Sequence, residues 1–297
     1  MDELNSSWGL VKASWRVLRR DGEILIFPLL SFISSALIFG GALFLLNKTG
    51  ALGYFKEIFE SKDDSLHLME KIPLQFYGYL FIFYLVNYFS ITFFNVALIS
   101  CTLIRMGGQD PSVLDGVVYS VKRIKYIFGW AVFESTVGVV LIFIQNRIKI
   151  AGRWIAYFLN FSWSLASYLA VPIFVAEEKG PVETLKRSIE LFRGSWGEQM
   201  VGRFIFGSIG AIFGLLPMIG LLVFPFLAPK QCSEFFLHFL VFVITYGICM
   251  SILMEALKGV FQAALYFYAT EGVSPDGFDE GEIQSSFIMN NPGFFKA

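Results

Sequence analysis

Long apolar stretches alternate with shorter charged segments along the whole chain. Six of the apolar stretches hold few charges and are long enough to cross about 30 Å of hydrocarbon at about 1.5 Å per residue. They cover residues 24–46, 74–104, 126–145, 154–176, 204–229 and 235–254. The pattern predicts an all-α, polytopic membrane protein with six transmembrane helices.

Two of these predicted spans carry irregular features. The second is longer than one bilayer needs, so we expect it to tilt, to extend past the surface or to bend near Asn87 and Asn95. The fourth contains Pro172 near its end, and a proline can kink a span because neighbouring groups re-satisfy the carbonyls that it frees.

The composition agrees with a membrane protein and excludes several other classes. Hydrophobic residues make up 56% of the chain and charged residues 16%, well away from the balance of soluble domains. A net charge of -1 argues against a nucleic-acid partner, which requires a surplus of Lys and Arg on one face. The cysteines are odd in number and far apart, and neither histidine has a second one nearby, so we expect no disulfide framework, metal or cofactor.

The basic residues predict the orientation of the spans. Residues 1–23, 102–125 and 177–198 and the tail after Ala269 together hold 13 Lys and Arg, against 8 in the loops on the opposite side. Because cytoplasmic loops carry the excess of positive charge, we expect both termini in the cytoplasm and the spans in a bacterial plasma membrane. The first apolar stretch is too long for a signal peptide and has no persuasive cleavage site, so we expect it to remain as a span.

Three cytoplasmic segments, before the first, third and fifth spans, share one pattern. In each, four apolar residues are spaced 3, 4 and 3 apart, which makes one stripe on a helix: Trp8, Val11, Trp15 and Leu18; Leu114, Val117, Val121 and Ile124; Val182, Leu185, Ile189 and Phe192. A serine stands six residues after the first of each set (Ser14, Ser120, Ser188) and a base eleven residues after it (Arg19, Lys125, Arg193). The alternative is that any three amphipathic helices can be aligned in this way.

The shared pattern predicts three repeats, at residues 6–104, 110–176 and 181–270. Each is an amphipathic helix at the membrane interface, with its bases near anionic lipid, followed by a transmembrane hairpin. Asp110–Pro111 and Gly180–Pro181 are typical helix starts, and Gly272 is a typical helix end. We expect one transmembrane domain over residues 1–272 and a cytoplasmic tail over 273–297.

Both ends of the chain resemble an uncharacterised family of bacterial membrane proteins. The resemblance rests on residues 7–18, SWGLVKASWRVL, with FPLL at 27–30, and on residues 263–272, AALYFYATEG, with Pro275, Gly277 and Phe278 after them. It implies a six-span architecture. It implies no reaction and supplies no catalytic residues.

A small set of polar residues within or near the spans forms a candidate intramembrane cluster: Glu134, Arg203, Arg105, Lys258, Asn87 and Asn95. Glu134 lies eight residues into the third span, about 12 Å along the helix, where an isolated carboxylate is costly. We expect it to face the bundle interior and to pair with a base, Arg203 first and Arg105 or Lys258 next. The alternative is a neutral glutamic acid that is hydrogen-bonded to a backbone carbonyl or to a neighbouring hydroxyl.

Two functions of different classes agree with these observations. Polar residues within spans favour transport or lipid handling. The sparseness of that polar set, with the apolar stretch 255–269 continuing the last span, favours an accessory subunit of a membrane complex, with a protein partner or a second copy of the chain. A membrane enzyme is a third alternative, but the chain has no GxxxxGK[ST], HExxH or GxSxG motif, so we expect no catalysis.

Overall fold

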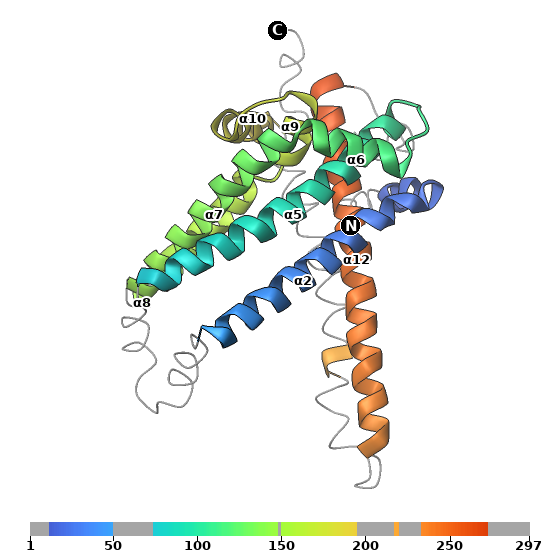
Figure 1. Cartoon of the computed structure of the whole chain (residues 1–297). Coiled ribbons are helices and arrows are strands. Elements are labelled where there is room, and N and C mark those ends of the chain that lie inside the picture. The colour runs from blue at the N-terminus through green and yellow to red at the C-terminus, as the bar shows by residue number, and fades with distance from the viewer. Residues whose placement is uncertain (1–11, 50–73, 148–149, 195–216, 220–232, 273–297) are drawn as a thin grey trace. The chain divides into compact units, whose positions relative to one another are not determined.

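The computed structural model describes residues 12–49, 74–147, 150–194, 217–219 and 233–272, and the only regular secondary structure in them is helical, as predicted. Residues 12–20 are helical, and the elements that follow are η1 (Gly22–Leu25), α2 (Ile26–Lys48), α5 (Leu74–Met106), α6 (Val113–Lys122), α7 (Ile124–Arg147), α8 (Ile150–Ala166), α9 (Ala170–Ala176), α10 (Pro181–Gly194) and α12 (Ser233–Glu271) (Figure 1).

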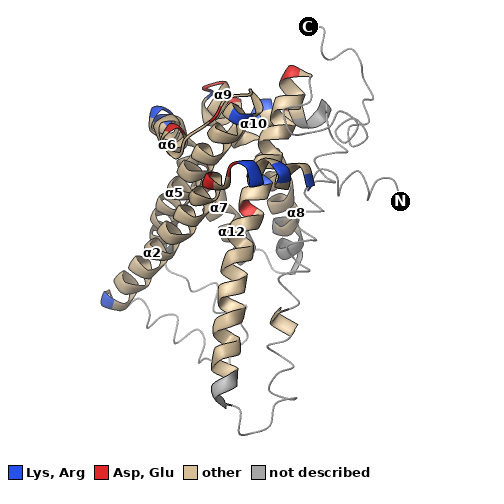
Figure 2. Ribbon diagram, turned by 90° about the vertical axis from the view of Figure 1, so that its right-hand side faces the viewer, with Lys and Arg blue, Asp and Glu red and all other residues tan. Residues whose placement is uncertain are grey.

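Within the described residues, five helical stretches are long and apolar enough to cross a membrane: Gly22–Lys48, Tyr77–Met106, Ile124–Ile144, Tyr157–Ala176 and Phe236–Glu271. They match five of the six predicted spans. The remaining one, residues 204–229, lies outside the described residues except for 217–219, so this fifth predicted span, the total of six spans and the third hairpin stay predictions. Charged residues are frequent on α6 and α10, and most of the length of α5 and α7 holds uncharged residues (Figure 2).

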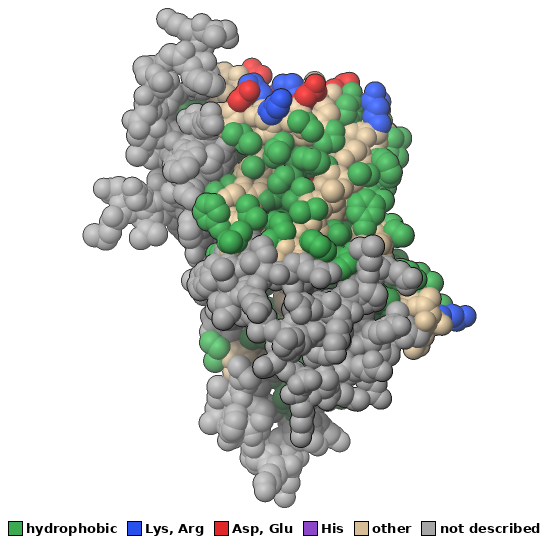
Figure 3. All heavy atoms as spheres, turned by 90° about the vertical axis from the view of Figure 1, so that its left-hand side faces the viewer, with side chains coloured by type: hydrophobic (Ala, Val, Ile, Leu, Met, Phe, Trp, Pro, Cys, Tyr) green, Lys and Arg blue, Asp and Glu red, His purple; other side chains and the backbone are tan. Residues whose placement is uncertain are grey.

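Large apolar side chains are exposed along the candidate spans, among them Leu37, Phe44, Ile82, Phe143 and Phe158. On the face that Figure 3 displays, apolar side chains cover the surface below a rim of charged ones. Such a surface is unfavourable in water and suits contact with lipid tails. The chain is therefore a membrane-embedded helical protein.

The chain folds as two compact units, residues 1–29, 98–113 and 191–297 in one and residues 30–97 and 114–190 in the other. In the second unit, consecutive spans run side by side. α2 contacts α5 through the Ser34 and Ser90 hydroxyls, 2.7 Å apart, and through the rings of Phe39 and Phe83. Because the numbering rises on one helix as it falls on the other, the two helices are antiparallel.

The same unit continues with α7 and α8. Gly138 of α7 leaves room for the ring of Tyr84 on α5, which lies 3.8 Å from where a Cβ would stand. Trp130 of α7 is almost fully buried and stacks on Trp163 of α8, with ring centroids 6.3 Å apart. Trp130 also contacts Phe174 of α9. Aromatic side chains thus fill the core between these helices.

The predicted fourth span is broken into α8 and α9 by a turn at residues 167–169. Pro172 explains the break, because its ring clashes with the carbonyl four residues earlier, that of Tyr168, and it has no N–H to donate. The N–H of Leu169, at the start of α9, donates instead to the Ser188 hydroxyl of α10 at 3.3 Å. The sequence allowed a kink at this proline, and the structure has a turn just before it.

Each cytoplasmic span end, on the predicted orientation, has a residue in the left-handed conformation with a proline three residues later. The residues are Gly108 (φ 80°), Glu178 (φ 53°) and Gly272 (φ 68°), and the prolines are Pro111, Pro181 and Pro275. Glycine takes this conformation without a steric cost, and it ends a helix by turning the chain away. The predicted helix end at Gly272 is confirmed, and the recurrence adds a structural signal to the predicted repeat.

The three repeat serines, Ser14, Ser120 and Ser188, are all fully buried. Ser120 of α6 donates to the Phe93 carbonyl of α5 at 2.9 Å, and Ser188 accepts from Leu169. Ser14 has no hydrogen-bond partner among the described residues. α6 and α10 therefore contact the neighbouring α5 and the turn before α9 through small buried polar residues, and not only through an apolar stripe.

α6 differs from its predicted extent. It ends at Lys122, and after the single linking residue Arg123 the chain starts α7 at Ile124. Ile124 and Lys125 therefore belong to the span helix and not to the amphipathic helix. The larger residues of the α6 stripe, Leu114 and Val121, are exposed, whereas Gly116 and Ser120 are buried.

Candidate functional site

Among the predicted intramembrane polar residues, Asn87 and Glu134 belong to contacts on different faces of α5. Asn87 shares the stripe of Phe83 and Ser90, which contact α2, and its side-chain oxygen is buried with no hydrogen-bond partner among the described residues. Tyr88, the next residue, is close enough to Glu134 of α7 for an electrostatic interaction. Asn87 thus lies on the face of α5 that contacts α2, whereas Glu134 interacts with α5 from α7. Asn95 is half-buried further along α5.

None of the bases predicted to pair with Glu134 is seen to do so among the described residues. Arg203 lies outside the described residues. Arg105 donates to two aspartates, and Lys258 lies 3.6 Å from Glu255 one turn away on α12. The pairing of Glu134 with a base stays a prediction.

The predicted interfacial residues are partly described. Trp15 and Arg19 are exposed on the helix 12–20, and the Lys125 ammonium lies 4.9 Å from the centre of the Tyr126 ring. Trp8 lies outside the described residues, and Arg193 is in α10. These positions suit a membrane interface, where aromatic and basic side chains gather.

The strongest candidate site begins at Asp21, the single residue between the helix 12–20 and η1. Its backbone N–H donates to the Val17 carbonyl at 3.2 Å, and its carbonyl accepts from the N–H of Ile24 at 3.0 Å. The aspartate occupies the N-cap position of η1 but makes no side-chain cap bond. Its carboxylate is therefore available to a more distant partner.

That partner is Arg105, in the last turn of α5. Its Nε and Nη2 donate to the two carboxylate oxygens of Asp21, and Nη2 also donates to Asp110. The side chains of Arg105 and Asp21 are 22% and 10% exposed, so the fork of two charged hydrogen bonds is largely shielded from water. We name Asp21, Arg105 and Asp110 the first hairpin bridge, because they join the start of one span to the end of the next.

The end of α5 places Asp110 within reach. Gly108 is left-handed, its N–H donates to the Arg105 carbonyl at 2.9 Å, and the N–H of Gln109 donates to the Ile104 carbonyl at 3.2 Å. This pair of bonds is the Schellman arrangement, which reverses the chain after a helix. The Cys101 thiol then donates to the Ser112 carbonyl at 3.5 Å, so the segment folds back over the last turns of α5.

A polar cavity of about 370 Å³ surrounds the first hairpin bridge. Three carboxylates and two guanidiniums line it, together with buried apolar side chains and backbone. The lining residues are Arg20, Asp21, Gly22, Glu23, Ile24, Phe27, Cys101, Arg105, Asp110, Pro111, Ser112 and Val113.

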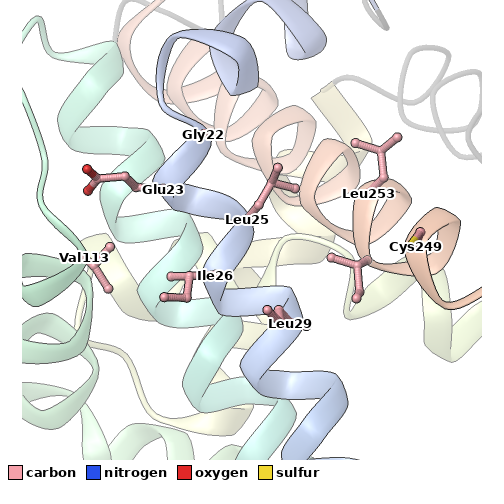
Figure 4. A pocket seen from close by; sticks show the side chains of 9 residues that line it. Gly22, Glu23, Leu25, Ile26, Leu29, Val113, Cys249 and Leu253 are labelled. Atoms are coloured by element: carbon pink, nitrogen blue, oxygen red, sulfur yellow. The ribbon is translucent and has the colours of Figure 1, made fainter. Parts of the chain in front are cut away.

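An apolar groove of about 860 Å³ adjoins this cavity and shares Gly22, Glu23 and Val113 with it. The rest of its lining is apolar apart from a free, exposed thiol: Leu25, Ile26, Leu29, Cys249, Ile252 and Leu253. In Figure 4, Leu25 and Leu29 come from the ribbon of η1 and α2, and Cys249 and Leu253 come from α12. The groove therefore runs from the polar cavity along the first turns of a membrane span.

Two close approaches hold this unit together around the groove. η1 packs against α12, and a Cβ added to Gly259 of α12 would collide with the Leu98 side chain of α5. The α12 residues around Gly259, such as Ala256, Val260 and Ala263, are fully buried. Small residues let helices approach closely in membranes.

Sequence reasoning identified Arg105 as a polar candidate but missed Asp21. A lone acid at the start of an apolar stretch is typical of a solvated charge. One signal could have found it, because Asp21–Gly22 interrupts the helical pattern between an amphipathic segment and a span.

Comparison with protein families matches residues 74–277 to DUF6159, which is described as a family of unknown function. The matched region takes in α5 to α12 and the closing segment 263–272, and leaves out residues 7–18. Comparisons with curated proteins and with solved structures found no match. Because the match covers more than half of the chain, the protein belongs to the DUF6159 family of unknown function.

Proposed function

We propose that this protein handles lipids, by binding one amphiphilic molecule at a time in the polar cavity and the apolar groove beside it. It does so in a bacterial plasma membrane that it crosses six times, in three hairpins with both termini in the cytoplasm. The proposal includes no catalytic step and no cofactor. It narrows the first predicted alternative, transport or lipid handling, to lipid handling.

The observation that carries the proposal is the continuity of a charged cavity with an apolar groove. An amphiphile needs charged partners for its headgroup and an apolar surface for its chain, and binding sites of this size hold small ligands. The groove follows η1 and α2 from Gly22 to Leu29, about 10 Å at the helical rise. A groove of this kind admits a molecule from the side, which suits one that arrives from the bilayer.

The accessory role has lost one of the observations that favoured it. The apolar stretch 255–269 was expected to extend beyond the bilayer as a surface for a partner. In the structure most of its large apolar side chains are buried within the protein, among them Leu257, Phe261, Leu265 and Tyr266. The stretch is therefore occupied by contacts within the chain.

Filling the groove tests the proposal. In Leu253→Trp the larger ring occupies the groove, whereas Ile244→Trp adds the same ring to an exposed position of α12 outside it. Native mass spectrometry of protein extracted in mild detergent should show bound lipid in the wild type and in the control, and a loss of about tenfold in Leu253→Trp. Equal lipid retention in both variants would exclude the groove as the site.

The thiol of Cys249 gives a second measurement on the intact groove. In a Cys232→Ser variant, with Cys101 buried, added lipid should slow the reaction of Cys249 with N-ethylmaleimide. A rate that added lipid does not change would contradict occupancy. The orientation is tested separately: a fluorescent protein fused after Lys296 should fluoresce, and a phosphatase fused there should be inactive.

A further inference from the structure

We propose that the molecule bound in this site is a lipid whose headgroup carries a primary ammonium, of the phosphatidylethanolamine type, rather than an anionic lipid. This inference rests on the proposed function and names the class of lipid that the site takes. It concerns the groove alone, since the amphipathic helices are still expected to lie against anionic lipid.

The charges of the polar cavity favour a cation. Asp21, Glu23 and Asp110 bring three carboxylates, against the two guanidiniums of Arg20 and Arg105. Arg105 is already engaged by two of these carboxylates, so its hydrogen-bond donors are largely used within the protein. An incoming phosphate monoester or glycerol phosphate would meet a net negative cavity whose best cation is occupied.

Glu23 is the residue that distinguishes the headgroups. It is exposed, it lines both the cavity and the groove, and its carboxylate has no ion pair or hydrogen bond among the described residues. In Figure 4 its carboxylate lies on the side of the η1–α2 ribbon away from α12, together with Ile26 and Val113. Because Glu23 lines both the cavity and the groove, a headgroup bound where the two meet lies near a carboxylate that has no partner among the described residues.

A primary ammonium is the group that fits this acceptor. It has three N–H donors and a compact charge, so it can donate to Glu23 and to the exposed carboxylate of Asp110. A quaternary ammonium carries the same charge but no donor, and a glycerol headgroup brings donors without the positive charge. The site should thus rank ethanolamine above choline, and choline above glycerol.

The test uses the full chain in nanodiscs made from equal amounts of phosphatidylethanolamine, phosphatidylcholine and phosphatidylglycerol. After release into mild detergent, native mass spectrometry identifies the bound lipid that Leu253→Trp loses. We expect phosphatidylethanolamine to exceed phosphatidylglycerol in that fraction by about threefold or more, the ratio that one partly exposed charge contact gives. Glu23→Gln should bring the ratio close to one, because the amide keeps the shape and removes the charge.

Glu255→Gln is the matched control, since it removes a carboxylate from α12 that lines neither the cavity nor the groove. The control should keep the wild-type ratio. If phosphatidylglycerol equals or exceeds phosphatidylethanolamine in the groove-dependent fraction, or if Glu23→Gln leaves the ratio unchanged, the headgroup assignment is wrong while lipid binding stands. If no lipid depends on the groove, the proposed function fails as well.

Discussion

In the first hairpin the residue that links the amphipathic helix to the span is an acid, Asp21, and it accepts from Arg105 at the end of α5. In the second hairpin the linking residue is a base, Arg123, and its Nε and Nη2 donate to the Val175 carbonyl at the end of α9, each at 3.2 Å. Its Nη1 also lies 2.5 Å from Glu178. We name Arg123, Val175 and Glu178 the second hairpin bridge.

The two bridges join the same places with opposite charges. The first depends on a carboxylate that is largely shielded, whereas the second uses a backbone carbonyl in the last turn of a helix and a half-exposed acid, 53% exposed. Carbonyls at the end of a helix have no partner within it, and a base there also interacts favourably with the helix dipole. Both hairpins therefore have a polar contact from the linking residue to the end of the next span, but the linking residue is an acid in one and a base in the other.

The largest effect should come from the shielded acid. Asp21→Asn removes the largely shielded charge that Arg105 binds, and we expect the free energy of unfolding to fall by about 2–3 kcal/mol, because the partly buried guanidinium keeps only the exposed Asp110 as a charged partner. Thermal unfolding in detergent measures it. The double variant Asp21→Asn with Arg105→Gln should lose less free energy of unfolding than the two single variants lose together. Strictly additive losses would contradict a direct interaction between the two side chains.

A smaller effect is expected in the second bridge. Arg123→Lys keeps the charge but loses the fork of two N–H donors on the Val175 carbonyl, so the free energy of unfolding should fall by about 1–2 kcal/mol. Lys122→Arg, one residue earlier on the exposed surface, is the control and should be neutral. If Arg123→Lys melts at the wild-type temperature, the bridge is an electrostatic contact only.

Glu178 should show the smallest effect. Glu178→Gln removes a half-exposed ion pair, which contributes less than about 1 kcal/mol. Glu178→Gly loses the same pair but relieves the left-handed conformation that Glu178 adopts, a gain of similar size, so it should be nearly neutral. A Glu178→Gly variant that melts well below Glu178→Gln would show that the side chain matters more than the backbone.

The helices and the membrane class could be predicted because each span is a contiguous apolar run. The break in the fourth span was also predictable, since Pro172 acts on the turn just before it. The first hairpin bridge was not, because Asp21 and Arg105 are 84 residues apart and each looks like an ordinary interfacial charge. Contacts at that separation depend on how two hairpin ends are turned, which no local pattern records.

The positions of the repeat serines could be predicted from the sequence, but their burial could not. Their register was predicted from an apolar stripe, yet the structure buries the serines and exposes Leu114 and Val121 of that stripe. A stripe indicates which face of a helix is apolar. It does not indicate whether protein or lipid covers that face, because both are apolar solvents for it.

The hydrogen bond from Leu169 to Ser188 has a consequence for the biogenesis of the protein. The ribosome adds Leu169 19 residues before it adds the serine that accepts this amide. An unpaired N–H in hydrocarbon costs several kcal/mol, so the span cannot settle into its native geometry as it leaves the translocon. α10 must therefore pack against the turn between α8 and α9 before this part of the chain reaches its native geometry, and truncation after residue 180 should leave a protein that the membrane quality-control proteases recognise.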